Sequence, residues 1–555
     1  MKKYVIGMDF GTLSARALAV RLSDGEELGD AVFAYPHGVM EDSLPSGKRL
    51  PPLYALQHPE DYLDALRTAI PALLAETGIP PEEVAALGID FTACSFFPVD
   101  EDFTPLCMKP AFKDEPHAYC KIWKHHGDQA QAERMTALAK EMGEDWLSLY
   151  GGKVSPEWLF PKLLETAEEA PEAFSAAYRF VEAADWLSYR LTGRETHSAP
   201  FAGYKAFWNA ERGYLPSEKY LSALSPLFQN LCGTKLSAEI APLTDRAGVL
   251  NGEGAALTGL LPGTVLALPM IDGHAAMPAL GLSGDGDMMI ILGTSACHIL
   301  NSAEEKAVSG ICGYVRDGVI PGCVTYEAGQ SANGDCVDWF VRENLPEAYT
   351  VEARERGISV HKLLREKAER LKPGESGLLA LDWLGGNRSI LADASLSGLM
   401  LGMTLATKPE EQYRAWIEAT AFGTKRILDN FIEHGIAVRT VTAAGGIAAK
   451  DPMMMQIYAD VTGREIAVAG TAQAAARGSA VYAAAACGAY PSVKAAAKAL
   501  AVPPRAVYHP IPEHEKVYAE LYEMYCTLHD LFGVGEGTVM KRLYRLRVGK
   551  NQDNR

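Results

Sequence analysis

Two short stretches of the chain combine a turn, glycine and hydroxyl side chains in a way that suits phosphate binding. The first follows an apolar run at residues 5–8 and contains Asp9, Gly11, Thr12 and Ser14. Main-chain N–H groups and hydroxyls at such a turn can hold phosphate oxygens, and a neighbouring carboxylate can hold Mg²⁺ or a water bound to it. An ordinary β-hairpin would show the same residues, so this stretch alone leaves both interpretations open.

The second stretch repeats this pattern near the middle of the chain. An apolar run at residues 288–292 ends in Gly293, Thr294 and Ser295, and another apolar segment follows. Two copies of one strand–turn–strand device, one in each half, indicate an internally duplicated α/β protein. We therefore expect the two turns to hold the phosphates of one nucleotide.

A third glycine turn lies between a predicted strand at residues 438–442 and a predicted helix that starts at Asp451. Its glycines, Gly445 and Gly446, would let the backbone approach a flat base or a ribose. As a lone motif this turn is weak evidence, because short glycine motifs are common.

Three further residues are candidates for substrate chemistry. Asp272 ends an apolar strand and starts an Ala-rich helix, so it either caps that helix or points a carboxylate into a cleft. Lys205 lies in a mostly apolar stretch, where its ammonium needs partners unless it reaches the solvent. Trp123 offers a flat face that suits a sugar, although a helix start with surface histidines explains the same stretch at least as well.

These residues need elements that position them, and the surrounding pattern is typical of an α/β fold. The spacing of apolar residues predicts a helix at 61–76, a strand at 84–91 with polar residues at its end, and a long helix at 411–434. Ser155 and Pro156 predict the start of another helix. In such folds ligands bind outside the carboxyl ends of the strands.

The bulk composition predicts an acidic protein of two domains. The 555 residues exceed one domain, and a glycine- and aspartate-rich link predicts domains at 1–284 and 285–555. A net charge of −18 argues against nonspecific binding to nucleic acid or anionic membranes. We find no secretory signal, no run long enough for a membrane span and no CxxC pair among 10 cysteines, so we expect a cytoplasmic protein with free thiols.

Taken together, these features resemble the FGGY carbohydrate kinases, a branch of the actin, hexokinase and chaperone ATPase superfamily. The resemblance covers nearly the whole chain, and its longer runs are most like the ribulokinase branch. Besides the three glycine turns, it rests on residues 89–94, 122–126, 150–153, 182–186, 327–332, 379–383 and 455–464. The opening hairpin differs at Leu13 and Ala15, but its polar residues are present.

The resemblance implies two RNase-H-like domains of the actin/hexokinase type on either side of a cleft, with sugar on the first domain and ATP mostly on the second. It implies transfer of the γ-phosphoryl group of ATP to O5 of L-ribulose, a step of L-arabinose catabolism. Another pentulose, as in D-ribulokinases or xylulokinases, is the alternative substrate.

The resemblance also implies a role for each candidate residue. Asp272 would accept the O5 proton, and Asp9 would hold hydrated Mg²⁺. The phosphates would be held by Gly11, Thr12, Ser14, Gly293, Thr294 and Ser295. The adenosine would be lined by Gly445, Gly446, Lys450 and Gln456. The ketose pocket would contain Ala93, Trp123, Lys205, Asp272 and Glu327.

A protein of the same fold that binds ATP as a non-catalytic switch is the competing class. Such a protein lacks a sugar pocket, so Asp272 beside a Trp, Lys and Glu set favours the kinase. A sugar-responsive repressor is less favoured, because no helix-turn-helix precedes the first strand at Tyr4. A homodimer is the oligomer that we consider.

Overall fold

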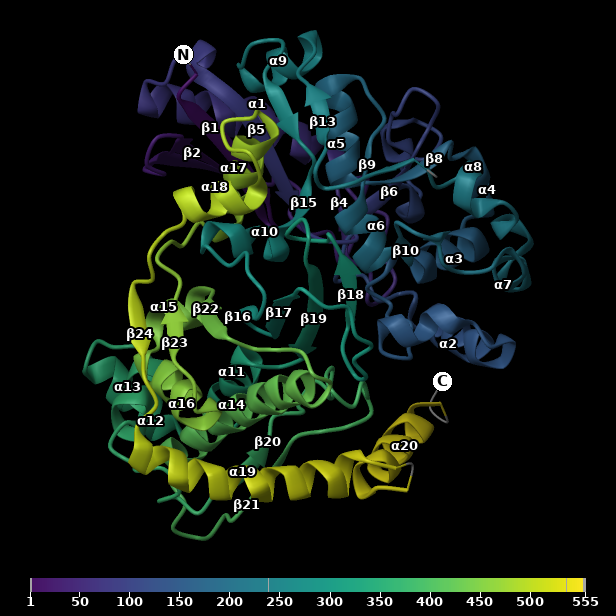
Figure 1. Ribbon diagram of the computed structural model, residues 1–555. Coiled ribbons are helices and arrows are strands. Elements are labelled where there is room, and N and C mark those ends of the chain that lie inside the picture. The colour runs from purple at the N-terminus through teal and green to yellow at the C-terminus, as the bar shows by residue number, and fades with distance from the viewer. Residues whose placement is uncertain (1, 238, 536, 553–555) are drawn as a thin grey trace. The chain divides into compact units, whose positions relative to one another are not determined.

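The computed structural model describes residues 2–237, 239–535 and 537–552 as a mixed α/β protein with two compact units (Figure 1). The first unit comprises Met1–Gly284, Tyr314–Thr325 and Gln473–Val502, and the second comprises Asp285–Gly313, Tyr326–Ala472 and Pro503–Arg555. The longest segment of the first unit ends at Gly284. Both units are nevertheless discontinuous in sequence, because two later segments belong to the first unit.

The first unit is built on a seven-stranded sheet whose centre is the opening hairpin. In spatial order its strands are β13 (Arg246–Val249), β14 (Val265–Ala267), β5 (Val84–Phe91), β1 (Tyr4–Phe10), β2 (Ser14–Arg21) and β3 (Glu27–Ala34), with β15 (Met270–Ile271) pairing with β5. β1 pairs antiparallel with β2 and parallel with β5, and β15 is also parallel to β5. The carboxyl ends of β1, β5 and β15 therefore lie at one edge.

A second seven-stranded sheet repeats this arrangement. Its strands in spatial order are β18 (Gly313–Arg316), β19 (Val324–Gln330), β17 (Ala296–Ser302), β16 (Asp287–Leu292), β22 (Thr440–Ala444), β23 (Ile466–Val468) and β24 (Ala506–Tyr508). β16 pairs antiparallel with β17 and parallel with β22, as β1 does with β2 and β5. This strand pairing confirms the internal duplication that the two turns predicted.

Several helices position the residues discussed below. In the first unit these are α1 (Pro59–Thr77), α2 (Gln129–Met142), α3 (Leu159–Glu169), α5 (Ala183–Thr192), α6 (Ala199–Lys205), α9 (Gly252–Thr258), α10 (Asp272–Ala279) and α17 (Ala474–Ala486). In the second unit they are α11 (Gly334–Glu343), α13 (Val360–Ala368), α14 (Pro409–Glu433), α15 (Gly446–Lys450), α16 (Pro452–Thr462) and α19 (Pro512–Gly533). The predicted helices 61–76 and 411–434 correspond to α1 and α14. The helix start predicted at Ser155 is wrong, since α3 begins at Leu159.

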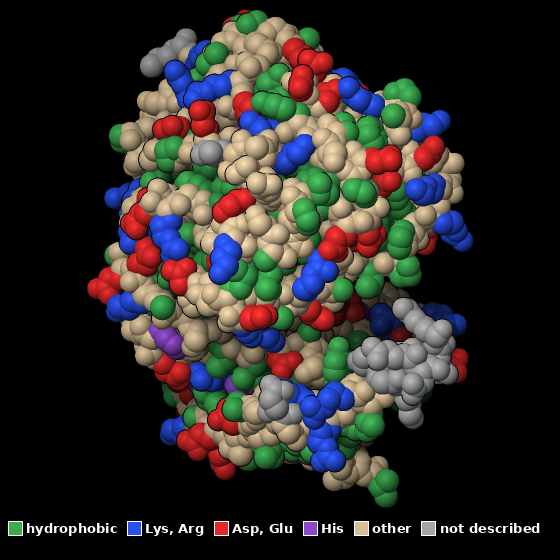
Figure 2. Space-filling model, turned by 90° about the vertical axis from the view of Figure 1, so that its right-hand side faces the viewer, with side chains coloured by type: hydrophobic (Ala, Val, Ile, Leu, Met, Phe, Trp, Pro, Cys, Tyr) green, Lys and Arg blue, Asp and Glu red, His purple; other side chains and the backbone are tan. Residues whose placement is uncertain are grey.

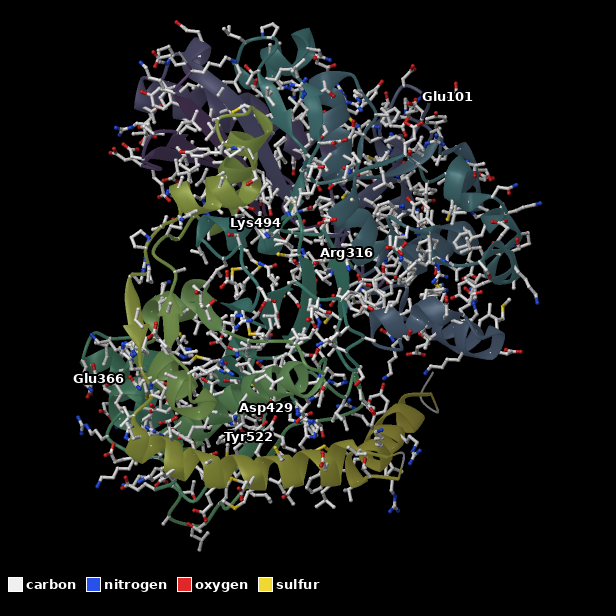
Figure 3. The ribbon with its side chains drawn as sticks, viewed as in Figure 1. Glu101, Arg316, Glu366, Asp429, Lys494 and Tyr522 are labelled. Carbon is white, nitrogen blue, oxygen red and sulfur yellow. The ribbon has the colours of Figure 1, made fainter. Side chains whose placement is uncertain are left out.

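The second unit joins its two longest helices through polar side chains. On α14, the Arg414 guanidinium donates to the hydroxyl of Tyr518 of α19 at 2.9 Å, and both groups are buried. Further along, the Tyr522 hydroxyl donates to Asp429 at 2.7 Å, and both residues are labelled in Figure 3. The late helix α19 is thus fixed to α14 at two points.

The surface charge is mixed on the face drawn in Figure 2, where acidic and basic side chains alternate without a large patch of one sign. The acidic side chains on this face are therefore spread out and do not form one acidic patch. Among the described residues, no helix is both long enough and apolar enough to span a membrane.

Helix α17 packs directly on the first sheet because two glycines leave room for it (Figure 1). Gly7 of β1 and Gly88 of β5 are register partners. A Cβ at Gly7 would lie 1.7 Å from the carbonyl oxygen of Ala476, and one at Gly88 would lie 2.0 Å from that of Ser479. The Ala-rich helix, although late in the sequence, is therefore part of the core of the first unit.

Gly7→Ala should destabilise the first unit, because the added methyl group would have to displace the backbone of α17. Overpacking of this kind costs about 1–3 kcal/mol. Gly252→Ala is the matched control, since a Cβ at Gly252 meets no atom within 4 Å. Calorimetric unfolding should show a lower Tm for the first variant only, and equal midpoints would contradict the close packing.

Candidate functional site

Three carboxyl groups meet near the carboxyl ends of β1, β5 and β15. Asp9 and Asp90 are register partners, and Met270 faces Asp90, which places Asp272 just beyond the end of β15. Burial raises the pKa of Asp90 well above its usual value, and the charges of Asp9 and Asp272 add to this rise. Burial also raises the pKa of Asp9, against the opposing effects of Asp90 and Arg16. Asp90 therefore retains its proton over a wider pH range than an exposed aspartate.

The hydrogen bonds of Asp90 and Asp272 show how these two carboxyl groups are held. Ser479 of α17 donates to Asp90 Oδ2 at 2.6 Å, whereas Asp90 Oδ1 is buried without a hydrogen-bond partner among the described residues. Asp272 Oδ1 accepts the N–H of Gly273 at 2.6 Å, and Ile271 occupies the N-cap position of α10. Asp272 is thus the first residue of the helix and not its cap.

The turn after β1 is held by two side chains from distant segments. Gln57 donates to the main-chain oxygen of Thr12 at 2.6 Å, and Trp123 Nε1 donates to Thr12 Oγ1 at 3.2 Å. Within the turn, the Gly11 N–H donates to the Ser14 carbonyl at 3.0 Å. Trp123 is 38% exposed, so part of its ring is open beside the turn. A residue expected for sugar binding and one expected for phosphate binding are thus in direct contact.

Lys205 ends α6 and is buried, which argues against the alternative that its ammonium reaches the solvent. Burial raises the pKa of Glu182 to about 8, and the charge of Lys205 is one of the effects that oppose this rise. The charge of Lys205 also opposes the rise that burial causes in the pKa of Cys94. Ala93, the residue before Cys94, follows β5 and is partly exposed. Lys205 and Ala93 therefore lie in one neighbourhood of the first unit.

A buried histidine fixes the start of α6. The Ser198 N–H donates to Asp185 Oδ1 at 3.1 Å. His197 places Nδ1 3.5 Å from Asp185 Oδ2 and Nε2 2.9 Å from Glu195 Oε1. Burial by itself would lower the pKa of His197. The hydrogen bonds and charges of Asp185 and Glu195 outweigh this effect and raise the pKa to about 9. A cationic His197 thus holds the segment that leads to Lys205.

The second unit contains a pocket of about 660 Å³ beside the turn after β16. Four of the predicted nucleotide residues line it: Gly293, Thr294, Gly446 and Lys450. The sequence interpretation missed the rest of the lining, which comes largely from helices. Its apolar part includes Val337, Tyr413, Ile417, Ile447 and Met454, and its polar part includes Asp338, His361, Lys362 and Arg365. An apolar floor with a polar rim suits a base and its ribose.

The turn beside this pocket is fixed by the start of α11. The N–H groups of Asn333 and Gly334 donate to the carbonyls of Thr294 and Gly293 at 2.7 and 2.9 Å. Gly445 has a φ of +94°, and a Cβ there would lie 2.5 Å from the carbonyl oxygen of Leu292. Gly445 therefore shapes the turn without lining the pocket.

Three other predicted residues are placed differently. Ser295 is not among the lining residues of the pocket. Gln456 donates to Asp460 Oδ1 at 2.8 Å and to the His509 carbonyl at 2.9 Å, and it is also absent from the lining. Glu327 lies on β19 in the second unit, whereas the other residues expected for the ketose belong to the first.

Comparisons with known proteins show the family of this chain. A profile of the FGGY family of carbohydrate kinases, C-terminal domain, matches residues 288–487. Ribulokinase from Geobacillus thermodenitrificans (strain NG80-2) is 48% identical over 98% of this chain and 97% of its own length. Ribulokinase from Anoxybacillus flavithermus (strain DSM 21510 / WK1) is also 48% identical, with the same coverage. The chain belongs to the FGGY family of carbohydrate kinases.

Solved structures show the fold of this FGGY kinase. A ligand-bound xylulose kinase from Lactobacillus acidophilus aligns with a TM-score of 0.78 at 20% identity, over 96% of this chain and 99% of that one. The fold is therefore the two-domain ATPase fold of the actin and hexokinase type, as the resemblance implied. The enzyme is a carbohydrate kinase, for which ATP is the phosphoryl donor.

His197→Gln should change how the stability of this FGGY kinase depends on pH. Because the pKa of folded His197, about 9, lies above the ordinary 6.5, its ion pairs contribute fully below pH 6.5 and are lost as the pH rises through 9. The stability lost by the variant should therefore be larger at pH 6 than at pH 9.5, by at most about 3 kcal/mol. Urea unfolding of both proteins at each pH measures this, and a loss independent of pH would show that His197 is neutral.

Proposed function

We propose that this kinase transfers the γ-phosphoryl group of ATP to O5 of L-ribulose, giving L-ribulose 5-phosphate and ADP in L-arabinose catabolism. The observation that carries the substrate is the 46–48% identity to several ribulokinases over nearly the whole chain. The geometry within each unit supports phosphoryl transfer.

Asp272 is the proposed general base. It lies beyond the end of β15, near two other carboxyl groups, and it is only partly buried. A base for phosphoryl transfer must accept the proton of the attacking hydroxyl as the bond to phosphorus forms. Because Asp272 lies at the sheet edge and is not the N-cap of α10, its carboxylate can serve as this base.

Asp9 is the proposed holder of a hydrated Mg²⁺. Carboxylate oxygens are the donors that Mg²⁺ prefers, and Asp9 supplies them at the end of β1, near the carboxyl group of Asp272. When bound, the ion would neutralise charge on the transferring phosphoryl group. Arg16, the register partner of Asp9 on β2, would keep the Asp9 carboxylate oriented for this role.

The second unit is the proposed nucleotide site. Main-chain groups of Gly293 and the hydroxyl of Thr294 would bind phosphates, and the apolar residues Tyr413, Ile417 and Met454 would contact the base. We retain Gly446 and Lys450 in this site. Because the Gln456 amide is bonded elsewhere, we leave it out. Gly11, Thr12 and Ser14 remain the proposed phosphate contacts of the first unit.

The first unit is the proposed sugar site. Lys205 would bond ketose hydroxyls, Ala93 would leave space beside it, and the partly exposed ring of Trp123 would contact the carbon chain. A site that hydrogen-bonds a hydroxyl rejects analogues that lack it or present it differently. The role of Glu327, which lies on β19 of the second unit, stays a prediction, and so does a homodimer.

An ADP-release screen across L-ribulose, D-ribulose, D-xylulose, pentitols and glycerol tests this function. L-ribulose should give the largest kcat/KM, and ATP hydrolysis without sugar should be low. A preference for D-xylulose or D-ribulose would replace the proposed substrate with the alternative one. ATP turnover that no sugar stimulates would favour the non-catalytic switch.

Asp272→Asn should keep ATP and sugar binding near wild type and lose most turnover. A general base contributes about 10²–10⁴-fold to the rate. Asp102→Asn is the control, because Asp102 is an exposed loop aspartate. Steady-state kinetics and equilibrium binding on both variants measure this, and a fall in kcat of less than about tenfold would exclude Asp272 as the base.

A further inference from the structure

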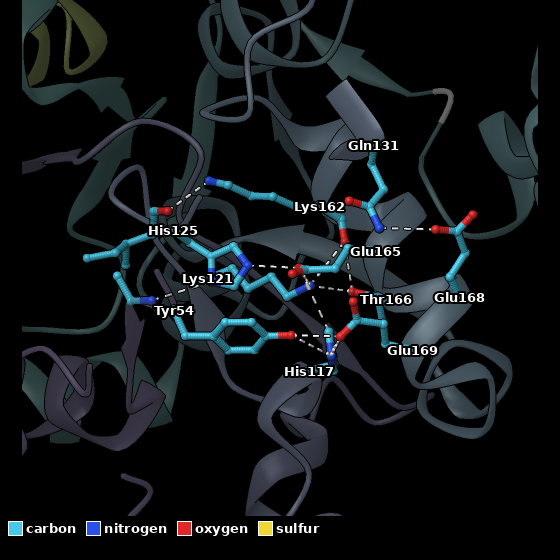
Figure 4. A network of polar contacts seen from close by, with 12 residues as sticks. Tyr54, His117, Lys121, His125, Gln131, Lys162, Glu165, Thr166, Glu168 and Glu169 are labelled. Atoms are coloured by element: carbon cyan, nitrogen blue, oxygen red, sulfur yellow. Dashed lines mark hydrogen bonds and ion pairs between the residues drawn. The ribbon is translucent and has the colours of Figure 1, made fainter. Parts of the chain in front are cut away.

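A buried polar network binds both ends of the segment that carries Trp123 (Figure 4). At one end, Lys121 Nζ donates to Glu165 Oε2 at 2.6 Å and to Thr166 Oγ1 at 2.8 Å. At the other end, His125 Nε2 lies 2.8 Å from the same Glu165 oxygen. Glu165 and Thr166 both belong to α3, so this helix is the support on which the segment rests.

A second lysine, Lys162 of α3, contacts the segment from another side. Lys162 is completely buried, and its Nζ donates to the Ile122 carbonyl at 2.8 Å. The same Nζ lies 3.3 Å from the carbonyl oxygen of Cys94 and 3.3 Å from that of Glu157. One ammonium thus connects the loop after β5 with the segment of Trp123.

Two buried carboxyl groups, those of Asp128 and Glu182, lie near Lys162. Burial raises the pKa of Asp128 to about 8 and that of Glu182 to about 8, and in both cases the charge of Lys162 opposes the rise. Burial also acts to raise the pKa of Glu165, but Lys121 and His125 bring it below the usual value. Burying an ammonium is costly unless it is hydrogen-bonded and paired, so this lysine is constrained to its present contacts.

We propose that Lys162 is a positioning residue of the sugar site. It fixes Ala93, through Cys94, and Trp123, through Ile122, at a set distance from each other. Trp123 in turn donates to the hydroxyl of Thr12, whose main-chain oxygen is held independently by Gln57. Main-chain carbonyls are the direct acceptors, so Lys162 acts on the loops as a whole and does not touch the sugar. This inference rests on the proposed function of the first unit.

Hydrogen exchange tests the positioning without any assay of activity. Lys162→Met keeps most of the length of the side chain and removes the ammonium, and it should speed exchange at residues 92–95 and 122–126. Lys124→Met is the control from the same segment, because Lys124 is 42% exposed and lies 3.4 Å from the exposed Glu41. The control should exchange like wild type. Unchanged exchange of both segments in Lys162→Met would overturn the proposal.

Steady-state kinetics test the consequence for the sugar. Lys162→Met should raise the KM for L-ribulose by about tenfold or more, as expected for lost charged hydrogen bonds, and change the KM for ATP by less than about twofold. Lys162→Arg, which keeps the charge, should recover part of the loss. An equal rise in both KM values with a lowered Tm would indicate a general structural role and overturn the proposal.

The two tests separate this inference from the proposed function. If no pentulose is phosphorylated by wild type, the proposed function fails, and faster exchange in Lys162→Met still supports a role in fixing the two loops. If wild type is active on L-ribulose and Lys162→Met matches it in both exchange and kinetics, the positioning role fails alone.

Discussion

Parallel pairing of β5 with both β1 and β15 is the constraint on which the first unit depends. This pairing brings Asp9, Asp90 and Asp272 to one edge of the sheet, where burial disfavours the charged forms of Asp9 and Asp90. Such a group of acidic side chains is stable only if protons or cations compensate it. Arg16 and the hydroxyl of Ser479 supply part of this compensation, and a phosphoryl-bound cation would supply more.

Much of the fold followed from local sequence patterns. The periodicity of neighbouring residues is enough to predict the two hairpins. It also predicts β5, α1 and α14, so a single sequence suffices for these elements. The place of α17 in the first unit does not follow in this way, because it depends on contacts across most of the chain. Gly7 and Gly88, each inside a strand, were the available signal, since such glycines mark close approach of another backbone. The helix start at Ser155 failed because a favourable capping residue also suits a turn.

The candidate nucleotide site was likewise predictable only where its residues form a local sequence pattern. Gly293, Thr294 and Gly446 were predicted because glycine turns leave a local signature. His361 and Tyr413 were not, because residues on a helix show only which face is apolar, and the sequence does not tell which helices converge on one pocket. The contacts around Trp123 are equally hidden, since its segment is held by α3, which lies further along the chain.

The contact between Trp123 and Thr12 shows how these distant segments act on chemistry. A hydroxyl that accepts a hydrogen bond from an indole N–H keeps its own proton available for donation. Thr12 is thereby turned into an oriented donor, which is what binding of a phosphate oxygen requires. The orientation depends on where Trp123 lies, and Lys162 and Glu165 set that position from inside the unit. The position of Trp123 therefore depends on this buried network, whereas the turn that carries Thr12 is also held by Gln57 and by its own hydrogen bond between Gly11 and Ser14.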